Sequence, residues 1–177
     1  MTDDGEFVRA VVAQLPALRR YAVALAGNAA QADDLVQDSI ERALRQASQL
    51  RELKSLPAWL RRILYNRYID GIRRDRFRGK VQDIFDHTDD PALSVPAIDG
   101  AEARDFLRAI NALSAEHRQI LLLVGLEDLS YQEISDEIGI PLGTVMSRLA
   151  RARERLRVML QNGPGADVRP PAAKEER

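Results

Sequence analysis

The sequence predicts an all-α protein, with two small helical domains joined by a flexible acidic linker. Aromatic residues make up only 5% of the 177 residues, and runs of β-branched residues are scarce, which disfavours β-strands. Apolar residues instead recur at the 3.6-residue helical period in several separate stretches. A chain of this length allows one or two small domains. The predicted boundaries are a first domain at 1–77, the linker at 78–101, a second domain at 102–162 and a disordered tail at 163–177.

The first predicted helix spans residues 6–26. Phe7 and Val11 lie four residues apart and begin its apolar face. Pro16 is expected to restart the helix, because proline lacks the backbone N–H that an uninterrupted helix needs. The helix should end at Gly27, the kind of residue that commonly closes a helix.

A second helix, predicted from about residue 29 to residue 47, has an apolar stripe on one side and a polar, mainly acidic face on the other. That face consists of Asp34, Gln37, Asp38 and Glu41. Two interpretations remain open for it. Composition alone favours an ordinary solvated face, whereas a docking surface for a basic protein partner is the more specific alternative.

The third predicted helix, 59–77, is strongly basic. Residues 58–80 contain eight basic and two acidic side chains, a net charge of +6. The aromatic residues interleaved with these arginines are Trp59, Tyr65, Tyr68 and Phe77. Aromatic rings that stack bases beside arginines that follow phosphates are typical of a surface for single-stranded nucleic acid. The alternative is a set of core aromatics with a basic rim.

The next stretch, 78–101, shows no periodicity and contains two prolines and five aspartates, so a flexible linker is predicted there. Residues 81–105 carry seven acidic side chains and one basic one, a net charge of −6. The tail at 163–177 is rich in proline and glycine and is predicted to be disordered. Residues 141–160 carry five arginines and one glutamate, a net charge of +4. The acidic connector therefore separates two basic blocks, 58–80 and 141–160, which suggests two separate nucleic-acid contacts.

After two further predicted helices, residues 129–160 read as two helices with a tight corner. Ser130 and Glu133 form the S-x-x-E pattern of a capping box, and Gly139 stops the first helix. Thr144 is a plausible cap for the second helix. The apolar stripe of that second helix consists of Val145, Leu149, Ala152, Leu156 and Leu160.

The opposite face of this last helix combines small and basic side chains. Ser147, Ala150, Arg151 and Glu154 lie on this face, and further arginines flank them. Such a face suits a DNA major groove, with the centre near base edges and the flanks near phosphates. The pattern predicts a helix-turn-helix. An ordinary surface helix with a solvated basic face is the alternative.

Composition also limits the classes of function. The chain contains no cysteine, so disulfides and thiolate metal sites are excluded. No apolar run approaches the ~18 residues that a membrane span needs, and the acidic N-terminus does not resemble a signal peptide. Paired catalytic carboxylates, a nucleophile constellation and a glycine-rich phosphate loop are also missing. We therefore expect a cytoplasmic protein without cofactors that is not an enzyme.

Three motifs resemble the extracytoplasmic-function (ECF) group of the bacterial sigma-70 family of RNA polymerase subunits. They are ADDLVQDSIERA at 32–43, PAWLRRILYNRYIDGIRR at 57–74 and LSYQEISDEIGIPLGTVMSRLARARERL at 129–156. The resemblance implies a factor that binds core polymerase and directs promoter-specific initiation, in a stress or envelope response under the control of an anti-sigma factor. It also implies that residues 1–77 correspond to sigma region 2 and residues 102–162 to sigma region 4.

The resemblance assigns roles to the surfaces described above. The acidic face of Asp34, Gln37, Asp38 and Glu41 would dock on the β′ clamp helices of the polymerase, with the β flap as a second contact of the factor. The loop at 45–57 and the following basic helix would recognise and melt the −10 element, with one base flipped into a pocket. The −10 residues implied are Trp59, Arg61, Arg62, Asn66, Arg67, Arg73 and Arg74.

The last helix would read the −35 element in the major groove. Residues near bases would be Met146, Ser147, Ala150 and Arg151, and those near phosphates would be Thr144, Arg148, Arg153 and Arg155. Two alternatives to a sigma factor remain at this point. One is a sigma mimic that titrates an anti-sigma protein, although the retained basic surfaces weigh against it. The other is a stand-alone helix-turn-helix repressor, which would need no acidic docking face.

Overall fold

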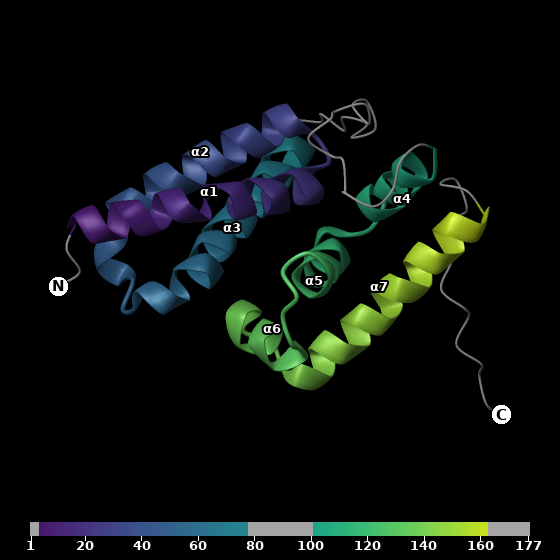
Figure 1. Ribbon diagram of the computed structural model, residues 1–177. Coiled ribbons are helices and arrows are strands. Elements are labelled where there is room, and N and C mark those ends of the chain that lie inside the picture. The colour runs from purple at the N-terminus through teal and green to yellow at the C-terminus, as the bar shows by residue number, and fades with distance from the viewer. Residues whose placement is uncertain (1–3, 78–100, 163–177) are drawn as a thin grey trace.

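The computed structural model describes residues 4–77 and 101–162, and their secondary structure is entirely helical. The α-helices are α1 (Asp4–Ala26), α2 (Ala29–Arg45), α3 (Leu56–Phe77), α4 (Ala101–Asn111), α5 (Ala115–Gly125), α6 (Tyr131–Ile138) and α7 (Leu142–Asn162) (Figure 1). Two short 3-10 turns, Ala47–Gln49 and Leu53–Ser55, connect α2 to α3. The predicted all-α fold is confirmed. The predicted linker, apart from its last residue, and the predicted tail lie outside the described residues.

The first three helices form one group, in which α2 packs against both α1 and α3 (Figure 1). Gly27 ends α1 with a left-handed φ of 71°, as predicted. The side chain of Asn28 then caps α2 by accepting a hydrogen bond of 2.9 Å from the backbone N–H of Gln31. The expected restart at Pro16 is wrong, because α1 continues through that residue as one helix of 23 residues. Pro16 removes one hydrogen-bond donor, but the packing of α1 on both neighbouring helices holds the helix together.

The remaining helices form a second group in which α5, α6 and α7 pack against one another. The helix-turn-helix prediction matches α6 and α7. The first half of the predicted stripe is fully buried, with Val145, Leu149 and Ala152 at most 2% exposed. The C-terminal end of the stripe is less buried, and Leu160 is 47% exposed.

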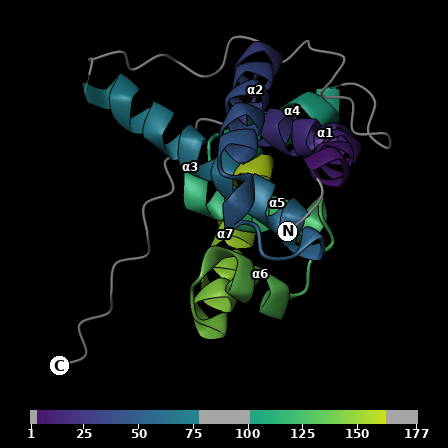
Figure 2. The same ribbon diagram turned by 90° about the vertical axis from the view of Figure 1, so that its left-hand side faces the viewer.

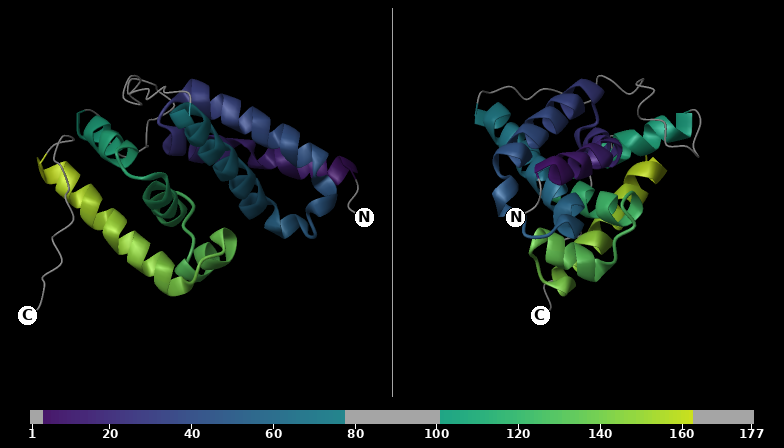
Figure 3. Two further views of the ribbon diagram at one scale, coloured as in Figure 1. Left: turned by 180° about the vertical axis from the view of Figure 1, so that it is seen from behind. Right: turned by 60° about the vertical axis from the view of Figure 1, so that its left-hand side comes forward.

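The two groups are packed against each other rather than held apart. Helix α1 contacts α4 and α5, and α3 contacts α6 (Figure 2). Tyr21 and Leu64 of the first group belong to the same buried apolar cluster as Leu123, Ile134 and Val145 of the second. Seen from behind, α5 lies between the first group and α7 (Figure 3, left). The two predicted nucleic-acid surfaces therefore belong to one continuous body in this conformation.

Candidate nucleic-acid and protein interfaces

The corner of the helix-turn-helix is fixed by local hydrogen bonds. Ser130 Oγ accepts a hydrogen bond from the backbone N–H of Glu133, and the Glu133 carboxylate accepts one of 2.8 Å from the backbone N–H of Ser130. This is the predicted capping box. Hydrogen bonds from the Ser130 side chain and backbone lower the pKa of Glu133. Gly139 then ends α6 with a left-handed φ of 70° and directs the chain into α7.

Helix α7 exposes the residues predicted to lie near bases. Met146, Ser147, Ala150 and Arg151 are all exposed, on the side opposite the buried stripe. Thr144 is not the cap of this helix as predicted, because α7 begins two residues earlier at Leu142. Thr144 instead lies in the first turn, half-buried. The geometry leaves one side of α7 free to approach a duplex.

The flanking arginines of α7 differ in their surroundings. Arg153 is exposed, whereas Arg148 lies 3.4 Å from the carboxylate of Glu116 on α5. Arg155 is half-buried, with its guanidinium 3.3 Å from Nδ1 of His117. Burial, followed by the positive charge of Arg155, lowers the pKa of His117. Two of the α7 arginines that were predicted to bind phosphates, Arg148 and Arg155, therefore contact residues of α5.

A groove of about 710 Å³ follows one side of α3. It brings together five of the seven predicted −10 residues, namely Trp59, Arg62, Asn66, Arg67 and Arg73. Arg74 is exposed but does not line this groove. Two carboxylates also line the groove, those of Asp70 on α3 and Glu116 on α5. The groove therefore contains cationic and aromatic side chains, the two kinds that bind single-stranded nucleic acids, together with an amide and two carboxylates.

The aromatic residues of α3 divide between the two interpretations left open by the sequence. Tyr68 is 4% exposed and belongs to the core, and Trp59 is half-buried with its ring edge-on to Phe7 at 6.4 Å. Tyr65 lines the groove, and burial, followed by the charge of Glu116, raises its pKa to about 12. Phe77, at the end of α3, is 94% exposed. Only part of the aromatic set is therefore available to stack on bases.

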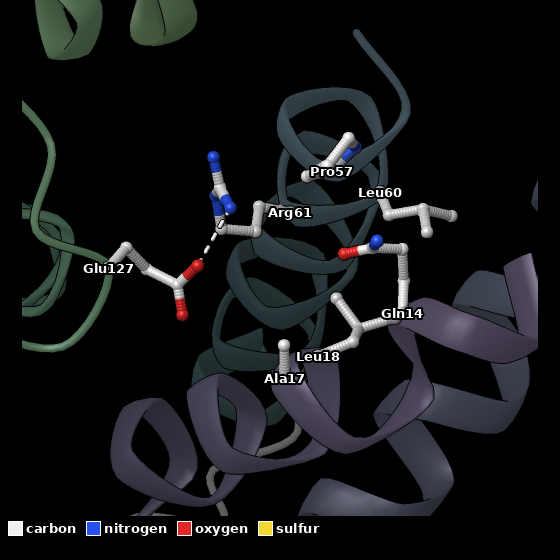
Figure 4. A pocket seen from close by; sticks show the side chains of 7 residues that line it. All are labelled: Gln14, Ala17, Leu18, Pro57, Leu60, Arg61 and Glu127. Carbon is white, nitrogen blue, oxygen red and sulfur yellow. Dashed lines mark hydrogen bonds and ion pairs between the residues drawn. The ribbon is translucent and has the colours of Figure 1, made fainter. Parts of the chain in front are cut away.

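Arg61 points away from the groove. Its guanidinium donates hydrogen bonds of 2.9 and 2.6 Å to Glu137 on α6 and one of 2.8 Å to Glu127, which follows α5. Figure 4 shows the Arg61 side chain leaving α3 toward Glu127, beside a small cavity of about 10 Å³. Burial alone would lower the pKa of Arg61, but the hydrogen bond and charge of Glu137, together with Glu127, raise it. In this conformation the Arg61 guanidinium is hydrogen-bonded to two carboxylates.

The predicted docking residues lie together on α2. Asp34, Gln37, Asp38 and Glu41 are all exposed, on the side of the helix away from the core. Asp38 forms an ion pair of 2.5 Å with Arg67, and Glu41 forms one of 2.9 Å with Arg45. Asp34 remains an exposed carboxylate beside these pairs. The face is accessible to a basic partner.

Arg118 is an important residue that the sequence analysis missed. It is 3% exposed and connects the two helix groups. Its guanidinium donates hydrogen bonds to the carbonyl oxygen of Leu25 at the end of α1, at 2.5 Å, and to the Tyr68 hydroxyl on α3, at 3.0 Å. It also donates to the carbonyl oxygen of Asn111 at the end of α4. No local pattern distinguishes this arginine from exposed ones, because its acceptors come from three other helices.

Two other kinds of feature are absent from the described residues. Among them, no cluster of three or more histidines and carboxylates could hold a metal ion. None of the helices in the described ranges is long and apolar enough to cross a membrane.

Two family models match the chain in the order of the two helix groups. "Sigma2 domain of PhyR" matches residues 11–65, and "Sigma-70, region 4" matches residues 103–156. The ECF RNA polymerase sigma factor EcfG of Rhodopseudomonas palustris is 33% identical over 164 residues, which cover 90% of this chain and 88% of EcfG. The ECF RNA polymerase sigma factor SigL of Mycobacterium tuberculosis is 37% identical over 150 residues, which cover 81% of this chain and 82% of SigL.

A solved structure is similar over most of the fold. It is the sigma factor RpoE of Bartonella quintana in complex with the anti-sigma factor NepR, with a TM-score of 0.72 and 31% sequence identity. The match covers 89% of this chain and 98% of the RpoE chain. By sequence, by the order of its two regions and by fold, the chain belongs to the ECF group of RNA polymerase sigma factors.

Proposed function

We propose that this sigma factor uses three separate surfaces during initiation. The acidic face of α2 docks on core RNA polymerase, the groove along α3 binds the −10 element, and the exposed face of α7 reads the −35 element. The observation that carries the proposal is the groove along α3, where five predicted −10 residues come together. In this assignment residues 1–77 act as region 2 and residues 102–162 as region 4.

At the −10 element, the groove would hold one unpaired strand. Arg62 and Arg73 are exposed and available to phosphates, and the half-buried Trp59 and Tyr65 line the same groove. Stacking on an aromatic ring is worth about 1–3 kcal/mol per base. That gain offsets the few kcal/mol needed to unstack a flipped base.

At the −35 element, α7 would enter the major groove with its first two turns leading. Arg151 is the exposed side chain best suited to a base, because a guanidinium can donate two hydrogen bonds to guanine. Met146 and Ala150 offer only apolar contacts, which suit a thymine methyl group. Arg153, and the other arginines once released, would bind phosphates and set the register.

We also propose that an anti-sigma protein controls this factor. The similar RpoE of Bartonella quintana is described in complex with the anti-sigma factor NepR. The two alternative roles, a sigma mimic and a stand-alone repressor, are not favoured. Relatives that this chain matches over more than four fifths of their length are themselves named RNA polymerase sigma factors.

The direct test is run-off transcription on genomic fragments with purified core polymerase. We expect specific transcripts only when this chain is added. Asp38→Arg should abolish them, because it reverses the charge at the centre of the acidic face without touching the core. Glu6→Arg, which reverses an exposed acidic residue on α1, is the matched control and should transcribe normally. Normal transcription by folded Asp38→Arg would refute the docking surface.

A further inference from the structure

His117 lies in the first turn of α5 and faces the arginines of α7, against which α5 packs (Figure 1). Its side chain is half-buried, and the ring nitrogen Nδ1 lies 3.3 Å from the guanidinium of Arg155. The backbone N–H of His117 donates to the hydroxyl of Ser114, which caps α5. The imidazole therefore rests against α7 while part of it still reaches solvent.

The contact with Arg155 defines the protonation state of the imidazole. A guanidinium has only N–H donors, so Nδ1 of His117 must accept in this contact. The ring is therefore neutral, with its proton on Nε2. Burial, followed by the positive charge of Arg155, lowers the pKa of His117, which agrees with a neutral ring at pH 7. A protonated ring carries hydrogen on both nitrogens and would have to release Arg155.

The surroundings of His117 carry an excess of positive charge. The charged groups that act on it come from its own helix and from α7, and they are Glu116, Arg148, Arg151 and Arg155. Glu116 lies 3.4 Å from Arg148, so the one carboxylate is paired with one of the three guanidinium groups. Tyr65 of α3 interacts with Glu116, and its pKa of about 12 keeps its hydroxyl neutral. Two positive charges therefore remain beside a neutral imidazole.

A phosphate diester fits this cluster. It carries one negative charge and two oxygens that are free to accept hydrogen bonds. Arg155 could donate to one oxygen and a protonated His117 to the other. Hydrogen bonds between charged groups are about twice as strong as those between neutral groups. Two of them would replace a single contact between a guanidinium and a neutral ring nitrogen.

We propose that His117 and Arg155 form a proton-linked binding site for one backbone phosphate of the −35 duplex. When the phosphate binds, Nδ1 of His117 takes up a proton from solvent and Arg155 turns from the imidazole toward the phosphate. Both side chains then donate to phosphate oxygens. The site lies beside Arg151, which is exposed on the base-reading face of α7. The assignment rests on the proposed function, because it requires α7 to lie on the −35 duplex.

Such a site makes binding to the −35 duplex depend on pH. The negative charge of the phosphate favours the protonated ring, so the pKa of His117 is higher in the complex than in the free factor. As the pH falls toward 6, the complex therefore holds more protons than the free factor, and binding becomes tighter. At pH 8 the ring is neutral in both states, and this contribution is absent.

The test measures the Kd of core polymerase carrying this chain for a promoter fragment found by run-off transcription, using fluorescence anisotropy at pH 6 and pH 8. His117→Gln is the reference, because its amide can accept from Arg155 but never gains a charge. Relative to that variant, the parent should bind about threefold more tightly at pH 6 and equally at pH 8, the effect of one partly exposed charge pair. His117→Lys, which is charged at both values, should bind more tightly than His117→Gln at both.

His87→Gln is the matched control for these measurements. It removes the second of the two histidines in the chain, which lies outside the described residues, and should keep the pH response of the parent. All variants should keep the helical circular dichroism of the parent. An equal loss of affinity at both pH values in His117→Gln would show a structural contact only and would overturn the proposal.

The salt dependence of binding provides a second readout that a purely structural role would not change. Each further phosphate that a protein neutralises steepens the slope of log affinity against log salt by about 0.9. The slope of the parent should therefore be steeper at pH 6 than at pH 8, whereas His117→Gln should show the same slope at both. Equal slopes for the parent would also overturn the site.

The free chain tests the geometry without any promoter. In a His87→Gln background His117 is the only histidine, so NMR follows its titration directly. Arg155→Met should raise the pKa of His117, because it removes the positive charge with the largest effect on the ring. Arg153→Met, which removes an exposed arginine of the same helix, should leave the titration unchanged. An unchanged titration in Arg155→Met would overturn the pairing.

The two proposals fail in different ways. If the polymerase with this chain makes no promoter-specific transcripts, the proposed function fails. Specific transcripts, together with the same pH response in the parent and in His117→Gln, would overturn the phosphate site alone.

Discussion

Replacing Arg118 by methionine should lower the free energy of unfolding by about 3–5 kcal/mol. Arg118 is 3% exposed, and its hydrogen bonds end on carbonyl oxygens at the C-termini of two helices. The last four carbonyl groups of a helix have no helical N–H to accept from. The guanidinium therefore caps α1 at Leu25 and α4 at Asn111 together, and its positive charge complements the dipoles of both helices.

The expected loss in unfolding free energy follows from the carbonyl oxygens that the substitution leaves without a hydrogen-bond donor. Methionine fills a similar volume but donates nothing, so the carbonyl oxygens of Leu25, Asn111 and Leu113 lose this donor. Each unsatisfied buried acceptor costs about 1–3 kcal/mol. Burial of the guanidinium costs desolvation free energy, and it lowers the pKa of Arg118. Methionine avoids this desolvation cost, which offsets part of the loss in stability. Removing one member of a buried charged network typically costs about 3–5 kcal/mol.

Urea unfolding followed by circular dichroism measures this difference. Arg108→Met is the matched control, since Arg108 lies on α4 in an exposed pair whose contribution should be below about 1 kcal/mol. Arg118→Lys should give an intermediate loss, because one ammonium group cannot reach both helix ends. A loss below about 1 kcal/mol for Arg118→Met would refute the capping role.

Four further predictions concern single positions. Arg151→Ala should weaken binding to a −35 duplex by about 1–3 kcal/mol, measured by fluorescence anisotropy on duplexes with single base changes; an equal loss on every duplex would show a phosphate contact instead. Ser130→Ala should cost about 0.5–2 kcal/mol in urea unfolding at neutral pH. The hydrogen bonds from the Ser130 side chain and backbone lower the pKa of Glu133 from 4.5, so their stabilisation is present above about pH 4.5 and is lost as the pH falls further. The variant keeps the backbone N–H and should therefore show a smaller acid-side loss. Gly27→Ala should cost about 1–3 kcal/mol, because φ is 71° and the new Cβ would lie 2.5 Å from an amide side chain of α4. By contrast, Gly71→Ala has open space within α3 and should stabilise the chain by about 0.5–1 kcal/mol.

The sequence alone determined the positions of most helices and which side of α7 is exposed. Val145 and Leu149 are buried because they recur at the helical period, and the capping box of Ser130 with Glu133 marks the start of α6. These signals are local, since each depends on residues within a few turns of one helix. For the same reason the end of α1 at Gly27 was predictable. The continuity of α1 through Pro16 was not, because packing on neighbouring helices decided it.

Only the tertiary structure decided what the arginines do. Arg61 and Arg62 are neighbours in one basic helix, yet Arg62 lines the groove and Arg61 is buried between two glutamates. Arg118 likewise gives no local sign that it joins α1, α3 and α4. A charged side chain takes its role from partners that the fold brings within about 3 Å, and those partners here lie as much as 93 residues away. Periodicity places a residue on a helix face, but packing between helices decides what that face meets.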